Sequence, residues 1–149
     1  MNNTESCFVV QEGEVRLENY DDIQIRIVLR ITNKMRWFCA YLGYPKEYDL
    51  NIQHGDPRIR AHGGITFSQD VKSELMNLNE NERNNYKWIG WDYQHCDDLT
   101  NIADYESNTK RLTHYYYKEV EDDVAIAVID LIKCIPNNNT IHFSRSKKV

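Results

Sequence analysis

The feature that most constrains the fold is a strict alternation of side-chain types between residues 23 and 31. The apolar positions are Ile23, Ile25, Ile27, Leu29 and Ile31, and they alternate with Gln24, Arg26, Val28 and Arg30. A period of two in β-branched residues predicts a strand that buries one face. Residues 33–36 have the composition of a turn, and the alternation resumes over residues 37–41 before Pro45. The sequence therefore predicts a β-hairpin over residues 22–43.

Further extended segments are predicted on both sides of this hairpin. Residues 87–92, with the sequence KWIGWD, have the composition of a third core strand. Two short apolar runs, residues 7–10 and residues 15–17, predict strands that are separated by a turn at Gly13. The extended pattern of residues 58–67 predicts a further strand-like segment. We expect these strands to join the hairpin in one sheet.

A single long helix is predicted near the end of the chain, where apolar residues recur at helical spacing. These residues are Tyr117, Val120, Val124, Ala127, Val128, Leu131 and Ile132. Pro136 ends the helix, because proline cannot continue it. The predicted fold class is α+β, a largely antiparallel sheet packed against one long C-terminal helix. We expect a single domain over residues 1–149, with a core of about residues 7–135 and a solvated C-terminal tail over residues 136–149.

Composition excludes several functional classes. The 149 residues carry a net charge of −5 and their basic residues are scattered, which argues against duplex nucleic acid as a partner. No apolar run approaches the ~18–20 residues that span a bilayer, so no membrane association is expected. The first residues have no basic region followed by an apolar stretch, which favours a cytoplasmic protein. The 4 cysteines are far apart, form no C-x-x-C pair and are expected to stay reduced.

Two segments place reactive side chains beside backbone that a ligand can approach. They are HGGITF, residues 62–67, and GWDYQHCDD, residues 90–98. Asp92, His95 and Asp98 are spaced three apart, so a helical turn after the strand would bring them to one side. With His62 as a fourth ligand, this set suits a borderline divalent cation that activates water. Whether a metal or another cofactor binds stays open at this point.

The same residues also suit a site without metal. His62 or His95 would act as general base or acid, with Asp92 or Asp98 fixing the histidine tautomer. The simpler interpretation is that Asp92 caps the turn that follows it and that His62 is a hydrogen-bonded core histidine.

Other residues of the two segments are candidates for ligand contacts. The glycine pair would offer backbone N–H groups to a phosphate or carboxylate, and the aromatic rings would stack on a base. The predicted ligand-binding residues are Gly63, Gly64, Thr66, Trp91 and Tyr93. Three arginines, Arg58, Arg60 and Arg111, would hold an anion if the fold brought them together.

The two segments together resemble a family of small uncharacterised phage and prophage proteins. Members carry H-G-G-[LI]-T-[FY], a variable loop, and a W-[FI]-G-F-D-x-x-H-x-x-D segment. The similarity covers about residues 36–134. The chain departs from the pattern at Trp91, where Phe is usual, and at Asp97, where a small residue is usual. The resemblance implies a phage-related origin, a shared site at His62, Asp92, His95 and Asp98, and location in the host-cell cytoplasm.

Three functional hypotheses follow from this resemblance, since small phage accessory proteins often act against host defence. In the first, the protein binds a nucleotide-derived ligand such as an immune signal. In the second, it is a metal-assisted phosphodiesterase that degrades such a signal. In the third, it inhibits a host defence protein, as anti-CRISPR proteins do, through the acidic surface at residues 119–123. A homo-oligomer is compatible with each of them.

Overall fold

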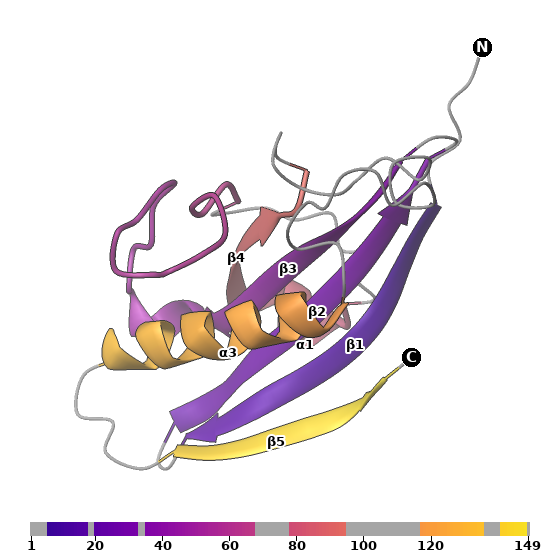
Figure 1. Ribbon diagram of the computed structural model, residues 1–149. Coiled ribbons are helices and arrows are strands. Elements are labelled where there is room, and N and C mark those ends of the chain that lie inside the picture. Colours follow the sequence, from indigo (N-terminus) through magenta and orange to yellow (C-terminus); the bar gives the residue numbers. More distant parts are fainter. Residues whose placement is uncertain are drawn as a thin grey trace.

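The alternating segment forms the central strand of an antiparallel sheet. The computed structural model describes residues 6–17, 20–32, 35–67, 78–94, 117–135 and 141–148. Within these, the order of the five strands is β4-β3-β2-β1-β5, and helix α3 lies across one face (Figure 1). The elements are β1 (Ser6–Leu17), β2 (Tyr20–Ile31), β3 (Arg36–Pro45), the 3-10 turn η1 (Lys46–Tyr48), α1 (Glu80–Asn84), β4 (Tyr86–Asp92), α3 (Tyr117–Lys133) and β5 (Ile141–Lys148). The predicted α+β class is confirmed.

Three elements of the prediction are confirmed in detail. Strands β2 and β3 form the hairpin, with Gln24 opposite Gly43 and Ile31 opposite Arg36. Strand β4 pairs with β3 along the far side of the hairpin. Helix α3 has the expected bounds, and its apolar stripe faces the sheet.

The prediction of two short N-terminal strands with a turn at Gly13 is wrong. Strand β1 runs unbroken for 12 residues. Its register against β2 shifts at two points, between Val9 and Gln11 and between Val15 and Leu17. At the first, Val9 faces Val28 and Gln11 faces Ile27, so Val10 is an extra residue. Beyond such a β-bulge, the positions that face each side of the sheet are exchanged. The alternation of apolar and polar residues is therefore interrupted there although the strand continues.

The C-terminal prediction also needs correction. Residues 141–148, assigned to a solvated tail, form strand β5, which pairs antiparallel with β1 at the edge of the sheet (Figure 1). The extended segment predicted over residues 58–67 is instead a series of turns, and Phe67 alone forms a β-bridge, to Gly90.

Side chains pack on both faces of the sheet. The face toward α3 holds Ile23, Leu42 and Ile89 against Val120 and Leu131 of the helix. The other face holds a second cluster made of Val28, Trp37, Cys39, Tyr41, Tyr86 and Trp88.

Buried Arg26 lies beside this second cluster. It pairs with Glu82, and its guanidinium carbon is 5.8 Å from the centre of the Trp88 ring. Burial of such a charge is tolerated only because a carboxylate compensates it.

Candidate functional site

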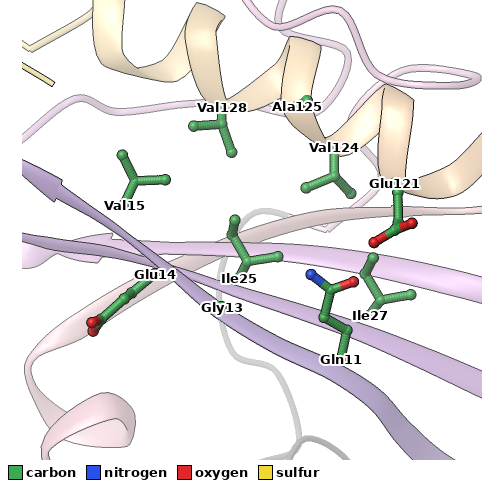
Figure 2. Close-up of a pocket in the computed structure, with 10 residues that line it drawn as sticks. All are labelled: Gln11, Gly13, Glu14, Val15, Ile25, Ile27, Glu121, Val124, Ala125 and Val128. Carbon is green, nitrogen blue, oxygen red and sulfur yellow. The ribbon is translucent and has the colours of Figure 1, made fainter. Parts of the chain in front are cut away.

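A cavity of about 380 Å³ lies between α3 and the β1–β2 part of the sheet (Figure 2). Most of its lining is apolar. The lining residues are Gln11, Gly13, Glu14, Val15, Ile25, Ile27, Glu121, Val124, Ala125 and Val128. Its volume is within the range of about 300–1,000 Å³ that is typical of small-molecule sites, which also share an apolar lining with few polar groups.

The bulge at Val10 determines which residues of β1 face the cavity. Before the bulge, Cys7 and Val9 pack on the second cluster. After it, Gln11, Gly13 and Val15 line the cavity. Without the extra residue, the alternation of strand side chains would turn these three positions away from α3.

Small side chains on both walls leave the space open. Gly13 has no side chain, and an added Cβ there would lie 3.6 Å from the Ile25 Cβ, an ordinary contact. The opposite wall is built from Val124, Ala125 and Val128 of α3. Val124 and Ala125 both lie three or four residues from Glu121 and from Val128, so the four positions share one side of the helix.

Polar atoms gather at one end of the cavity. The side chains of Gln11 and Glu121 lie together there, whereas the Glu14 carboxylate points away (Figure 2). Gln11 is only 3% exposed, and its Nε2 reaches to 3.9 Å from the point where a Gly13 Cβ would lie. The amide therefore runs along the floor of the cavity instead of turning to solvent.

The residues of the two predicted segments lie elsewhere, and none of them lines this cavity. Half-buried His62 stacks on Tyr93, with ring centroids 4.7 Å apart and planes 5° apart. The Tyr93 hydroxyl accepts a hydrogen bond from Trp91 Nε1 (3.0 Å) and donates one to Asp123 of α3 (2.9 Å). His62 is thus placed beside a hydrogen-bonded chain that joins β4 to the helix.

The predicted ligand-stacking role of the aromatic residues is not supported by their burial. Trp91 and Tyr93 are each 1% exposed, so neither ring face is presented to a ligand. Both rings belong to the core cluster under α3, since they fill the space between the strand and the helix.

Asp92 lies on the opposite side of the sheet from His62. It faces Cys39 across the β3–β4 ladder, and Cys39 belongs to the second cluster. Neighbouring residues of a strand point to opposite faces, so Asp92 and Tyr93 diverge. The Asp92 carboxylate accepts the backbone N–H of Gln94 at 3.1 Å, which is the turn-capping role weighed above.

The structure describes two of the four residues predicted to share a site, and these two do not meet. His62 and Asp92 are separated by the sheet, and His95 and Asp98 lie outside the described residues. Within the described part of the chain, no group of three or more His, Cys, Asp or Glu side chains is placed to hold a metal ion.

The glycine pair serves the turn that it belongs to. Gly63 and Gly64 have φ angles of 71° and 85°, in the left-handed region that favours glycine. The Gly64 N–H donates to the Ala61 carbonyl at 2.9 Å, so this donor is already used inside the loop. The exposed Thr66 donates its backbone N–H to the Gly90 carbonyl at 3.0 Å.

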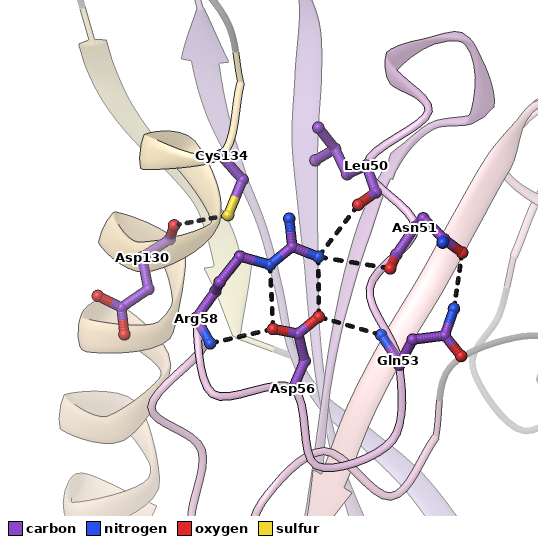
Figure 3. Close-up of polar contacts among 7 residues, drawn as sticks. All are labelled: Leu50, Asn51, Gln53, Asp56, Arg58, Asp130 and Cys134. Atoms are coloured by element: carbon purple, nitrogen blue, oxygen red, sulfur yellow. Dashed lines mark hydrogen bonds and ion pairs between the residues drawn. The ribbon is translucent and has the colours of Figure 1, made fainter.

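Two of the three arginines proposed to hold an anion have carboxylates of their own. Arg58 donates to both oxygens of Asp56, and Asp56 also accepts the backbone N–H groups of Gln53 and Arg58 (Figure 3). Arg60 forms a two-point pair with Asp130 of α3, with contacts of 3.0 Å. These pairs fasten the loop over residues 46–67 to itself and to the helix; Arg111 lies outside the described residues.

The pKa values of these carboxyl groups follow from the same contacts. The hydrogen bonds from Arg58 hold the pKa of Asp56 far below its usual range. The Arg60 side chain likewise lowers the pKa of Asp130. On the other face of the sheet, burial raises the pKa of the Cys39 thiol to about 11, so this cysteine is not an activated nucleophile.

The acidic run on α3 does not form one uniform surface. Asp122 is exposed, Glu121 lines the cavity, and Asp123 accepts the Tyr93 hydrogen bond. Successive helix residues are rotated by about 100°, which distributes the run over several faces.

Sequence reasoning missed the residues of the cavity. One signal was present, because Glu121, Val124, Ala125 and Val128 share a helix face that has no large apolar side chain, unlike the following turn with Leu131 and Ile132. The opposing small position at Gly13 was interpreted as a turn.

The described helices include none that is long and apolar enough to cross a membrane. Comparison of the chain with protein-family models, with curated proteins and with solved structures found no match.

Proposed function

We propose that the protein binds a small, mainly apolar molecule in the cavity between α3 and strands β1 and β2. The observation that carries this proposal is the unfilled apolar space itself. The cavity is a cleft that solvent reaches, since its lining includes exposed Ala125 and half-buried Ile25. Concave, mostly apolar clefts with few polar groups are typical of small-molecule sites. A ligand with an apolar body would supply the missing contacts.

Binding is favoured over turnover by the composition of the cavity. Glu121 is the one ionisable side chain directed into it among the described residues, since Glu14 points away (Figure 2). General acid–base catalysis normally pairs a proton donor with an acceptor or an activated nucleophile. The phage-related role, the nucleotide-derived ligand and the phosphodiesterase activity inferred from the resemblance remain predictions.

The first experiment measures dye binding by variants that add a side chain on either wall of the cavity. The probe is N-phenyl-1-naphthylamine, a neutral apolar dye that fluoresces when it leaves water. We expect saturable binding to the wild-type protein. Gly13→Val adds a side chain on the sheet wall and Ala125→Phe on the helix wall, and each should weaken binding at least tenfold.

The control variant is Ile126→Phe, which adds a ring on the exposed side of the same helix. It should bind the dye as the wild type does. Gly13→Val should leave the free energy of unfolding equal or raise it, because valine suits a strand better than glycine and its Cβ would meet only ordinary contacts. Absence of saturable dye binding, or equal binding by all four proteins, would contradict the proposal.

A second measurement addresses the hypotheses drawn from the resemblance. Cyclic and ADP-ribose-type nucleotides are incubated with the protein, with and without divalent metal, and analysed by mass spectrometry. A nucleotide retained unchanged would support a nucleotide-binding protein, and a nucleotide cleaved only with metal would support the phosphodiesterase. Recovery of every nucleotide unbound and intact would count against both.

A further inference from the structure

We infer that two copies of this chain associate through the outer face of α3, as a symmetric pair of antiparallel helices. The outer face consists of Asp122, Ile126, Ile129 and Lys133. Ile126 and Ile129 are 39% and 41% exposed, and they are two of the four large apolar side chains that are exposed in the described part of the chain. Exposed apolar side chains that adjoin one another indicate an interaction surface more than scattered single ones do.

The outer face is turned away from the sheet (Figure 1). Successive helix residues rotate by about 100°, which places its four positions within about 60° of one another. Val120, Ala127 and Leu131 point the opposite way, into the core. The four outer positions follow one another at intervals of four, three and four residues. This is the spacing of a coiled-coil seam, in which helices pack along one stripe.

The order of the side chains along the outer face makes it complementary to itself. It begins with an acid, continues with two isoleucines and ends with a base. In an antiparallel pair with its twofold axis between positions 127 and 128, Asp122 lies opposite Lys133 of the other copy, and Ile126 lies opposite Ile129. Opposite charges then meet at both ends of an apolar centre.

Other arrangements lack this match of charges. In a parallel pair, Asp122 would face Asp122 and Lys133 would face Lys133, and like charges across an interface are unfavourable. A partner with charge of one sign would meet a like charge at one end of the outer face. The charge pattern therefore favours a second copy in the antiparallel orientation.

The contacts of the two charged residues within the helix are compatible with this pairing. Asp122 pairs with Lys118 at 2.8 Å, but both side chains are well exposed, at 62% and 77%. Such exposed pairs are weak, and a carboxylate can accept from two lysines. Asp130, one turn before exposed Lys133, is held by Arg60 in two contacts of 3.0 Å.

The size of the contact determines the strength of association. One pair of helices buries less than the ~800 Å² per partner of a standard interface, so we expect a weak dimer with a dissociation constant of about 10⁻⁴ M. A twofold contact uses the same face of both copies, so association ends at two chains.

The test reverses the charges at the two ends of the outer face. Sedimentation velocity at concentrations around the expected dissociation constant should show a reversible monomer–dimer equilibrium for the wild-type protein. Asp122→Lys and Lys133→Asp each create a like-charge contact at both ends of the symmetric dimer. Each should weaken association about tenfold or more.

A double variant distinguishes this pairing from a general effect of either residue. Asp122→Lys combined with Lys133→Asp restores opposite charges at the same places, and it should associate within about threefold of the wild type. Glu47→Lys is the matched control, the same reversal at an exposed position of η1, and it should leave association unchanged. Urea denaturation establishes that each variant is folded.

The outcomes are decisive for this inference and independent of the proposed function. A wild-type protein that stays monomeric, or single variants that associate as the wild type does, would refute the helix pair. A double variant as weak as the single variants would show that Asp122 and Lys133 do not face each other. An equal effect of Glu47→Lys would assign the change to net charge and refute the pairing. Dye binding to the cavity is measured separately, at concentrations where the chain is a monomer.

Discussion

Two aromatic side chains lie over glycines of the neighbouring strands on the sheet face that is turned away from α3. An added Cβ at Gly43 would lie 2.8 Å from the Trp88 ring. At Gly90 it would lie 2.5 Å from Tyr41 Cδ1 and 2.7 Å from the Ala40 carbonyl oxygen. Tyr41 and Trp88 are buried, so neither ring can move aside freely. Glycine is required at these positions because the rings occupy the space of a side chain.

This contact leads to a prediction about Gly90→Ala. The variant should lower the free energy of unfolding by about 1–3 kcal/mol, the usual cost of overpacking a well-packed site. Urea denaturation measures the change. Gly13→Ala is the matched control, because its added Cβ would meet only ordinary contacts, and it should be neutral or slightly stabilising. Equal stability of the Gly90→Ala and wild-type proteins would show that the ring yields easily.

Residue chemistry could be read from the sequence more easily than residue placement. The sequence identified His62 and Asp92 as polar groups beside glycine and aromatic residues. Their separation depends on the alternation of side chains along a strand. Asp92 lies opposite Cys39 on one face of the sheet, whereas Tyr93 points to the other face, where His62 stacks on it. The local sequence does not indicate which face of the sheet the loop with His62 will cover. Whether His62 and Asp92 meet could therefore be decided only from the three-dimensional structure.

Among the elements, the loop over residues 46–67 is held by charges as much as by apolar contacts. Leu50, Ile52, Ile59 and Ile65 join the core, and buried Asp56 organises the backbone between them. A folded-state pKa below the unfolded value stabilises the folded state above the unfolded pKa. That stabilisation is lost as the pH falls toward the folded pKa.

Stability should therefore fall in acid through Asp56. The unfolded value is about 3.9, so the contribution is complete near neutral pH and is lost as the pH falls below about 4. Asp56→Asn should cost about 1–3 kcal/mol at pH 7 and flatten the acid part of the profile, because it weakens the bonds from Arg58. Chemical denaturation between pH 7 and pH 2 measures both effects.

The control for this prediction is Asp49→Asn, the same replacement in the same loop. Asp49 is exposed and has a φ of 50°, a conformation that asparagine tolerates. Its pH profile should follow that of the wild type. If Asp56→Asn and Asp49→Asn gave the same profile, the loop would owe its stability to apolar packing.

Elements with a continuous pattern could be predicted, and elements that depend on partners could not. The β2–β3 hairpin, β4 and α3 each bury a periodic stripe that is visible in the sequence. In β1, the bulge at Val10 interrupts the stripe without ending the strand. In β5, the sequence IHFSRSKK has only two apolar residues, and the strand is defined by backbone pairing with β1.

For the molecule as a whole, β5 protects the outer edge of β1. An unpaired edge presents backbone N–H and C=O groups to other chains. Deletion of residues 141–149 should lower the free energy of unfolding and produce dimers or larger species as the concentration rises. Denaturation and light scattering measure the two effects. Removal of Val149 alone is the control, and a truncated chain that stays monomeric and equally stable would refute this role.

The strand order also sets a sequence of events during synthesis. Among the described strands, β1 is synthesised first, whereas β5, one of its two neighbours in the sheet, is synthesised after the other four. Strands β2, β3 and β4 can assemble on its inner side while translation continues. The outer edge of β1 therefore lacks its partner strand until residues 141–148 have been synthesised.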